Sequence, residues 1–154
     1  MRRSDREITS NIQIKEILDK ADVCRIAFGN PRPYIVAMNF GYIWTDNLTI
    51  YFHCANEGKK IDLLEQNSEI CFQLDTNHQL ITHESACTWG MKYASITGYG
   101  HLSKVTDPAE KTLGLNSIMK HYGFAGEPLY NEKVFTITTV LKLNVTEISC
   151  KRKQ

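Results

Sequence analysis

The chain has 154 residues, of which 42% are hydrophobic and 23% are charged, and its formal net charge is +1. This length suits one domain, residues 1–154, with a hydrophobic core of its own. A net charge so close to zero argues against a general nucleic-acid binder, and no apolar run is long enough to span a bilayer.

The five cysteines are odd in number, and no two of them stand in a C-x-x-C spacing. This pattern argues against a disulfide framework and against a zinc site. No apolar segment follows the arginines near the N-terminus, so the sequence predicts no secretory signal. We therefore expect a cytoplasmic protein with reduced thiols and no bound metal.

The first third of the chain predicts one helix and two strands. An amphipathic repeat predicts a helix over Ser10–Lys20, and alternation predicts a strand over Val23–Phe28. Two prolines predict a turn over Gly29–Pro33. The nearly apolar run Tyr34–Tyr42 is typical of a strand covered on both faces.

Two residues interrupt that apolar run. Asn39 is either a polar residue with its hydrogen bonds satisfied or a contact to a ligand. Gly41 indicates either a bulge or a close approach of a ligand to the backbone.

A strand, a polar turn and a short helix follow as one unit. Asp46 and Asn47 predict a hairpin turn into a strand over Leu48–Phe52, which His53 ends. Asn56 is the expected N-cap of a helix that runs to Gln66.

Two lysines stand at an unusual place in this unit. Lys59 and Lys60 fall in the first helical turn, where free backbone N–H groups already make the field positive. A bound phosphate would make both lysines favourable there. The alternative is that they are solvated surface residues and that His53 only ends a strand.

The middle of the chain predicts two strands joined by a long loop. Glu69–Asp75 alternates as a strand, and the polar stretch Thr76–Met91 reads as a loop. A long strand follows over Tyr93–Val105, in which Gly98 and Gly100 indicate bending.

The last third predicts a helix and the longest strand. Asp107 is the expected N-cap of a helix that runs to about Tyr122. A linker follows over Gly126–Asn131, and Val134–Ser149 alternates as a strand. With six predicted strands, three helices and no βαβ rhythm, we expect a mainly β fold, an antiparallel six-stranded barrel with peripheral helices.

In this order the motifs resemble the FMN-binding split-barrel superfamily of pyridoxamine 5′-phosphate oxidase-like proteins, and within it the nitroimidazole-resistance (Nim) proteins. The resemblance spans nearly the whole chain. It is carried by Arg2-Arg3-Ser4-Asp5-Arg6-Glu7, Val23-Cys24-Arg25-Ile26-Ala27, Pro33-Tyr34-Ile35-Val36, Asn39-Phe40-Gly41-Tyr42, Tyr51-Phe52-His53, Gly58-Lys59-Lys60, Tyr93-Ala94-Ser95, Gly98-Tyr99-Gly100, Ile118-Met119 and His121-Tyr122.

The resemblance implies a split barrel that forms a homodimer with FMN at the subunit interface. It implies that the flavin ring lies along the strand of Val36, Ala37, Met38 and Asn39. It implies a phosphate site made by Lys59 and Lys60 with Tyr93 and Ser95, and it places His53 near the flavin as the catalytic candidate. Lys151 matches the lysine of a C-terminal Trp-Ser-Gly-Lys-like segment, whereas the Trp and Gly positions hold Ile148 and Cys150.

Two classes of function follow from these observations. The first is an FMN-dependent oxidoreductase that reduces a small aromatic or nitro compound, as a 5-nitroimidazole reductase does, with electrons from a nicotinamide or another donor. The second is a non-catalytic flavin- or haem-binding module, and the histidines that could serve as its axial ligands are His53, His78, His83 and His121. A split barrel that uses deazaflavin is a third alternative.

Overall fold

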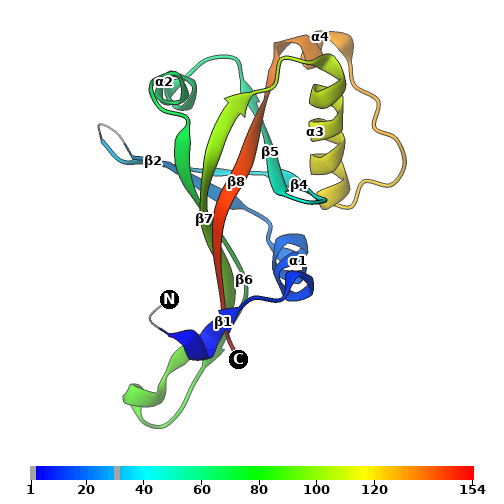
Figure 1. Ribbon diagram of the computed structural model, residues 1–154. Helices are drawn as coiled ribbons and strands as arrows, with labels where there is room; N and C mark the ends of the chain where they lie inside the picture. Colours follow the sequence, from blue (N-terminus) through cyan, green and yellow to red (C-terminus); the bar gives the residue numbers. More distant parts are fainter. Residues whose placement is uncertain (1–2, 30–31) are drawn as a thin grey trace.

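The computed structural model describes residues 3–29 and 32–154, so Arg2 and the centre of the predicted turn at 29–33 lie outside the described residues. The fold is mainly β with peripheral helices, as predicted (Figure 1). Its elements are η1 (Ser4–Arg6), β1 (Glu7–Ile8), α1 (Asn11–Lys20), β2 (Cys24–Phe28), β3 (Tyr34–Met38), β4 (Phe40–Trp44), β5 (Leu48–Ala55), α2 (Lys59–Gln66), β6 (Glu69–Ile81), η2 (Ala86–Thr88), β7 (Gly90–Lys104), α3 (Pro108–His121), α4 (Glu132–Ile137) and β8 (Thr138–Lys153).

All strands belong to one antiparallel, 8-stranded sheet with the order β3-β2-β6-β7-β8-β5-β4, and β1 pairs with β8. The strands at the two ends of this order, β3 and β4, follow one another in the chain and are separated only by Asn39. The sheet therefore curls around a core without closing between β3 and β4, which is the split barrel that the sequence predicts. Phe40, Phe52 and Phe72 are fully buried inside it.

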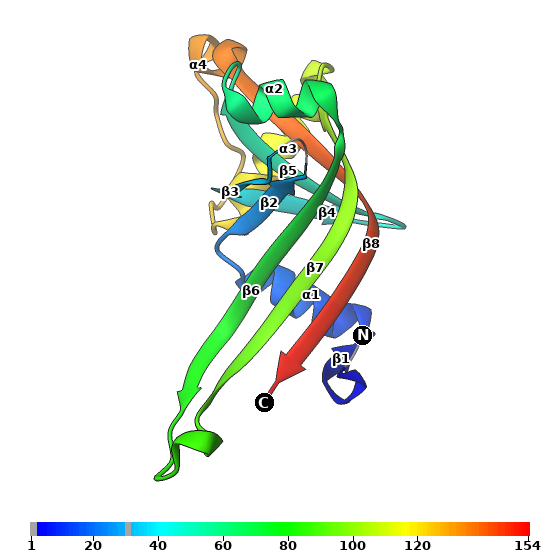
Figure 2. The ribbon, with the colours of Figure 1, turned by 90° about the vertical axis from the view of Figure 1, so that its left-hand side faces the viewer.

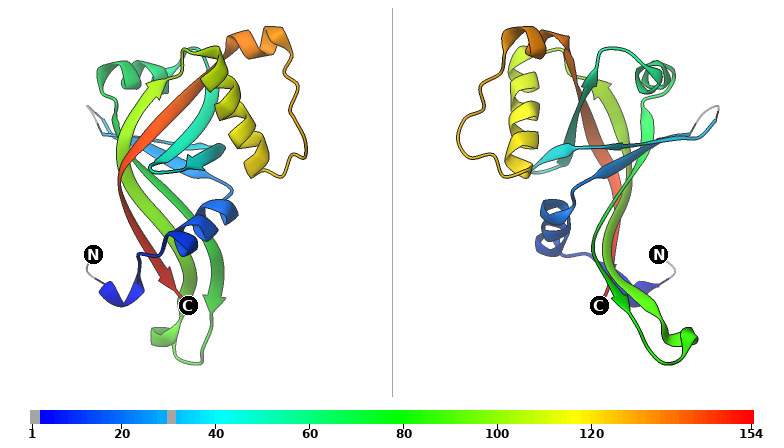
Figure 3. Two further views of the ribbon diagram at one scale, coloured as in Figure 1. Left: turned by 45° about the vertical axis from the view of Figure 1, so that its right-hand side comes forward. Right: turned by 180° about the vertical axis from the view of Figure 1, so that it is seen from behind.

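The predicted helices α1 and α3 are confirmed. Ile17 and Leu18 of α1 are fully buried against the sheet. Asp107 caps α3, since its carboxylate accepts a hydrogen bond from the Glu110 backbone N–H at 2.8 Å. Figure 3 shows α3 and α4 together on one side of the body, away from the long hairpin of β6 and β7. No helix among the described residues is long and apolar enough to cross a membrane.

The apolar run Tyr34–Tyr42 is two strands, not one. β3 pairs with β2 and β4 pairs with β5, so the chain changes sheet neighbours at Asn39. Met38 and Phe40 are both buried on the core side of this corner. The alternation therefore continues through the break, which is why the sequence pattern hides it. This division and the two-residue β1 account for the difference between the predicted six strands and the observed eight.

Half of the predicted loop Thr76–Met91 is strand. β6 continues to Ile81 and β7 begins at Gly90, so the two strands form an arm that extends beyond the body (Figure 2). Their register shifts between Thr76 and Gln79, where Asn77 has a φ of 59°. Most side chains along the arm are exposed, so no apolar alternation indicates a strand there.

The predicted last strand begins four residues too early. Val134–Ile137 belongs to the short helix α4, because the Asn131 side chain accepts hydrogen bonds from the N–H groups of Lys133 and Val134 and so starts a helix. Val134 and Ile137 are 58% and 64% exposed. They are three residues apart, so both lie on one face of the helix. Over so short a stretch, the pattern of apolar residues does not distinguish a helix from a strand.

Gly41 marks a close approach of backbone, but to a helix of this chain and not to a ligand. A Cβ atom at this position would lie 2.3 Å from the backbone of Ser117 and Ile118 in α3. Only a glycine lets α3 pack this closely on β4. The bend predicted in β7 is supported by a register shift against β8 between Tyr99 and Gly100.

We expect Gly41→Ala to destabilise the protein by about 1–3 kcal/mol or more, because the added methyl group must push α3 away from β4. Urea denaturation followed by circular dichroism measures the change. Gly29→Ala is the matched control, since a Cβ at Gly29 has no neighbour within 4 Å. Equal unfolding midpoints for the two variants would contradict this packing argument.

Candidate functional site

A cleft of about 510 Å³ lies where the sheet is split. It brings together the end of β3, the end of β5, the start of α2 and the helix α4. The lining residues are Val36, Ala37, Met38, Asn39, His53, Cys54, Ala55, Lys60, Val134, Ile137 and Thr138. Six of the predicted site residues are therefore neighbours in one cleft: Val36, Ala37, Met38, Asn39, His53 and Lys60.

The β3 side of the cleft is a strand edge. Since β3 ends the sheet order and pairs only with β2, its other edge carries backbone N–H and C=O groups that no strand among the described residues satisfies. Val134 and Ile137 of α4 bring apolar surface to the same cleft. A flat ring with polar atoms along one side fits such a surface, because it can use both the polar edge and the apolar patch.

The α2 side of the cleft is positively charged. No side chain caps the N-terminus of α2, and its N-cap is Gly58, with a φ of 116° that favours glycine. The predicted N-cap, Asn56, is wrong, because its side chain accepts a hydrogen bond from the Thr139 hydroxyl at 2.6 Å instead. Lys60, in the first turn of α2, lines the cleft, so a lysine and the start of a helix lie at the same side of it, which suits an anion.

The two predicted lysines point to different places. Lys60 lines the cleft, whereas the Lys59 ammonium lies 4.5 Å from the centre of the Tyr34 ring. Lys59 thus has a cation–π partner outside the cleft, while Lys60 is directed to where an anion would lie.

The sequence matches the family of pyridoxamine 5′-phosphate oxidase over residues 10–152. The chain belongs to this family. No curated protein matches the chain.

Solved structures with the same fold include a candidate 5-nitroimidazole antibiotic resistance protein from Bacteroides thetaiotaomicron, with 28% identity over 95% of this chain and 86% of that one and a TM-score of 0.81. The flavocytochrome Anf3 from Azotobacter vinelandii has 21% identity over 100% of this chain and 72% of that one, with a TM-score of 0.83. A FAD and haem binding protein from Mycobacterium smegmatis has 16% identity over 97% and 74%, with a TM-score of 0.81.

A flavin nucleotide fits the cleft of this family member by chemistry. This nucleotide combines a planar ring, which has polar atoms along one edge, with a chain that ends in a phosphate. The ring matches the free edge of β3 and the phosphate matches Lys60 with the uncapped start of α2. His53, which is exposed at the end of β5, lies beside both.

The other predicted site residues, Tyr93, Ser95 and Lys151, do not line this cleft. They lie on β7 and β8, where Ser95 is directly opposite Lys151 and the Lys151 ammonium is 5.6 Å from the centre of the Tyr93 ring. Ser95 is only 6% exposed. Within one chain the predicted site residues therefore lie in two separate groups, one in the cleft and one on β7 and β8.

Both groups nevertheless lie on the same face of the sheet. Ala37, Arg25, Gln73 and Thr97 are directly opposite one another across β3, β2, β6 and β7, and directly opposite residues share a face. Ser95 is two residues from Thr97, so it shares that face as well. Cys24 and Ile26, on either side of Arg25, point into the core, so this face is the outer one.

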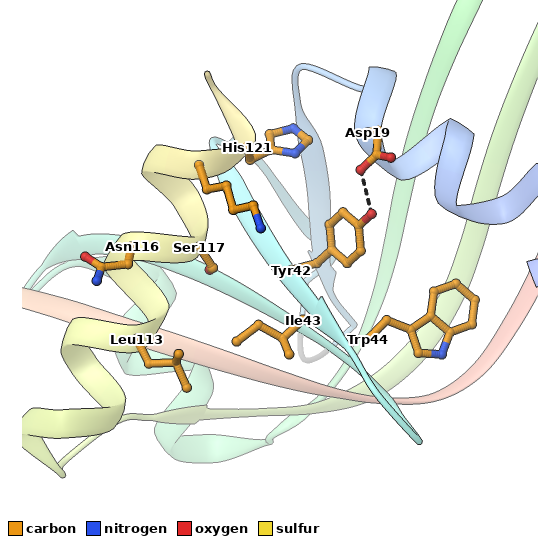
Figure 4. A pocket seen from close by; sticks show the side chains of 9 residues that line it. Asp19, Tyr42, Ile43, Trp44, Leu113, Asn116, Ser117 and His121 are labelled. Atoms are coloured by element: carbon orange, nitrogen blue, oxygen red, sulfur yellow. Dashed lines mark hydrogen bonds between the residues drawn. The ribbon is translucent and has the colours of Figure 1, made fainter. Parts of the chain in front are cut away.

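A larger cavity lies elsewhere. It has a volume of about 770 Å³ and is formed by α1, β4 and α3 (Figure 4). Tyr42 spans it by donating a hydrogen bond to Asp19 at 2.5 Å, and burial together with this bond raises the pKa of Tyr42. None of the predicted site residues lines it, and although the edge strand β4 forms one wall, no helix start lies among its lining residues. The smaller cleft alone among these two cavities combines the predicted site residues with a helix start.

Three of the histidines considered as haem ligands have protein partners. The Nδ1 atom of His83 accepts a hydrogen bond from the Ser85 backbone N–H at 3.4 Å. The Nε2 atom of His121 lies 2.8 Å from the Ala21 carbonyl oxygen, and its ring packs on Phe40. The Nε2 atom of His78 lies 2.7 Å from the Asp75 carboxylate. His53 alone among the four candidates lines the cleft.

Sequence reasoning missed the residues that the end of β5, the helix α4 and the start of β8 bring to the cleft: Cys54, Ala55, Val134, Ile137 and Thr138. One signal was present, because an asparagine followed by a glutamate is typical of a helix start, and Asn131-Glu132 has this pattern. The position of α4 beside β3 depends on contacts between segments about 100 residues apart, which no local pattern contains.

We expect the Cys54 thiol to react slowly with iodoacetamide at pH 8, because burial raises its pKa and so lowers the thiolate fraction. Cys87 is exposed and should react first, whereas burial raises the pKa of Cys150 to about 11 and that of Cys24 to about 12. Peptide mass spectrometry over a time course measures the order. All five thiols should react alike in urea, and labelling of Cys54 as fast as Cys87 in the folded protein would contradict this expectation.

Proposed function

We propose that this protein binds FMN in the cleft between β3, β5 and α2, and that it is an FMN-dependent oxidoreductase that reduces a small aromatic or nitro compound. The observation that carries the proposal is the placement of Lys60 and an uncapped helix start at one end of a cleft whose wall is a free strand edge. The family and its flavin-binding structural neighbours support it. The resemblance to a candidate nitroimidazole resistance protein supports the substrate class.

In this proposal each part of the cleft has one role. The backbone of Val36–Asn39 hydrogen-bonds the polar edge of the flavin ring, and Lys60 with the first N–H groups of α2 holds the phosphate. The bound flavin supplies the transfer of electrons. His53 donates a hydrogen bond or a proton to the compound that is reduced, a role that an imidazole performs near neutral pH.

The electron donor that we propose is a reduced nicotinamide or another reductant of the cytoplasm. All five cysteines are free, as expected for a protein of a reducing compartment. The competing hypothesis is a flavin carrier without catalysis. Consumption of NADH or NADPH by the FMN-loaded protein in the presence of a nitroaromatic compound would favour the enzyme, whereas tight FMN binding without turnover would favour the carrier.

We further propose that the protein acts as a homodimer that pairs through the outer face of the sheet. Ala37 of the cleft and the second group, Tyr93, Ser95 and Lys151, share this face but lie apart within one chain. A two-fold axis through the face would bring the second group of one protomer to the cleft of its partner. Tyr99 is 49% exposed and Ile35 is 66% exposed on this face, which supplies apolar area for the contact.

We expect Lys60→Ala to weaken FMN binding by roughly 10- to 150-fold, since a charge-assisted hydrogen bond contributes about 1.5–3 kcal/mol. Quenching of flavin fluorescence measures the dissociation constant. Lys59→Ala is the matched control and should change it much less, because Lys59 lies over Tyr34. Riboflavin, which lacks the phosphate, should bind the wild type and Lys60→Ala equally. An unchanged FMN affinity in Lys60→Ala would refute the phosphate assignment.

We expect the wild type to have twice the 17.6 kDa mass of one chain in size-exclusion chromatography with light scattering. Tyr99→Glu should give monomers and lower the FMN affinity, because it places a charge in the proposed contact and separates the two groups of residues. Leu129→Glu is the control, since Leu129 is 96% exposed on a loop away from this face. A monomeric wild type that binds FMN tightly would overturn the proposed dimer.

A further inference from the structure

A second cavity opens beside the flavin cleft. Its volume is about 240 Å³, and it lies between α3, α4 and the segment that joins them. The two cavities share three lining residues, His53, Val134 and Thr138. A molecule in this side chamber would therefore reach the cleft at His53.

The lining of the chamber carries no carboxylate, ammonium or guanidinium group. Leu115, Ile118 and Met119 come from α3, and Val134 and Phe135 come from α4. Moving a charged group from water into such surroundings without a partner is strongly unfavourable. The chamber therefore disfavours phosphorylated or carboxylated compounds, pyridoxamine 5′-phosphate among them.

Most polar atoms of the chamber are already used within the protein. The Tyr130 hydroxyl donates to the Asn116 side chain at 2.8 Å, and the Thr138 hydroxyl donates to the Val134 carbonyl at 2.8 Å. The Asn131 side-chain oxygen accepts from the start of α4. Among the described lining residues, the ring of His53 has no hydrogen bond to another side chain or to backbone, and it lies where the chamber meets the cleft.

The wall formed by α4 is held to α3 by one lysine. The Lys111 ammonium donates to the Phe135 carbonyl at 2.5 Å and lies 4.4 Å from the centre of the Phe135 ring. The Phe135 ring in turn packs against the Tyr130 ring, with centres 6.0 Å apart. These contacts give the chamber a fixed size, and for comparison an apolar cavity of about 150 Å³ holds a benzene molecule.

We propose that this side chamber is the substrate-binding site and that it selects an uncharged, single-ring aromatic compound with one polar substituent, which His53 contacts at the border of the cleft. This inference rests on the proposed function, because it places the ring next to the bound flavin. The ring lies between α3 and α4, the substituent faces the cleft, and compounds with a permanent charge are excluded.

Calorimetric titration with two matched probes tests the chamber without turnover. The probes are 4-nitrobenzyl alcohol, which is neutral, and 4-nitrobenzoate, which has the same ring and a carboxylate. We expect the neutral probe to bind at least tenfold more tightly, both to the FMN-loaded protein and to the FMN-free protein. Equal binding of the two probes would overturn the proposal.

Substitutions at Met119 locate the binding. Met119 lines the chamber and not the cleft. Met119→Trp should fill the chamber and weaken the neutral probe at least tenfold while the FMN titration stays unchanged, and Met119→Ala, which removes part of the chamber wall, should also change the affinity for the neutral probe. Met91→Trp is the control, because Met91 is exposed on the arm. Unaltered probe binding in both Met119 variants would refute the chamber.

The same titrations separate the two proposals. If the proposed function is wrong, the protein will fail to bind FMN, whatever the result with the probes. If the chamber is not the substrate site, FMN will bind normally, but the two probes will bind equally or their binding will not change in the Met119 variants. The neutral preference in FMN-free protein would support the chamber even if FMN did not bind.

Discussion

Asn39 is the only residue between two strands that pair at opposite ends of the sheet, β3 with β2 and β4 with β5. The sheet curls far enough to bury a core but cannot close there, because the chain must pass through the opening. The free edge of β3, the ends of β5 and α2, and the helix α4 all meet at this split. The candidate site depends on this constraint, since a closed barrel would satisfy the β3 edge and leave no polar wall for a ring.

The cleft at the split has little charge, and this charge lies on its α2 side. One ammonium group, that of Lys60, lies in the cleft with the start of α2, while its neighbour Lys59 is held over Tyr34. A site with one lysine and a helix start suits a single phosphate. The neutral chamber beside it, bounded by Leu115 and Met119, suits the opposite kind of molecule. The two cavities therefore differ in the charge of their lining, and His53 lines both.

The outer face of the sheet carries both groups of predicted site residues. Ala37 and Ser95 share that face although they lie on different parts of the sheet. The helices α3 and α4 are on a side of the body away from the arm of β6 and β7 (Figure 3). The chamber between α3 and α4 and the outer face of the sheet are therefore different surfaces of a small domain.

The sequence by itself determined the mainly antiparallel fold and the helix starts at Ser10 and Asp107, because periodicity and caps are local properties of the chain. The resemblance of its motifs to a family also named Val36–Asn39, His53 and Lys60 as candidate site residues, and the structure brings them to one cleft. Only the tertiary structure decided where the apolar run breaks at Asn39, since Met38 and Phe40 keep the alternation. Only it separated Lys60 from Lys59, and only it brought α4 to the cleft. These outcomes depend on which distant segments pack together, and a local pattern carries no information on that.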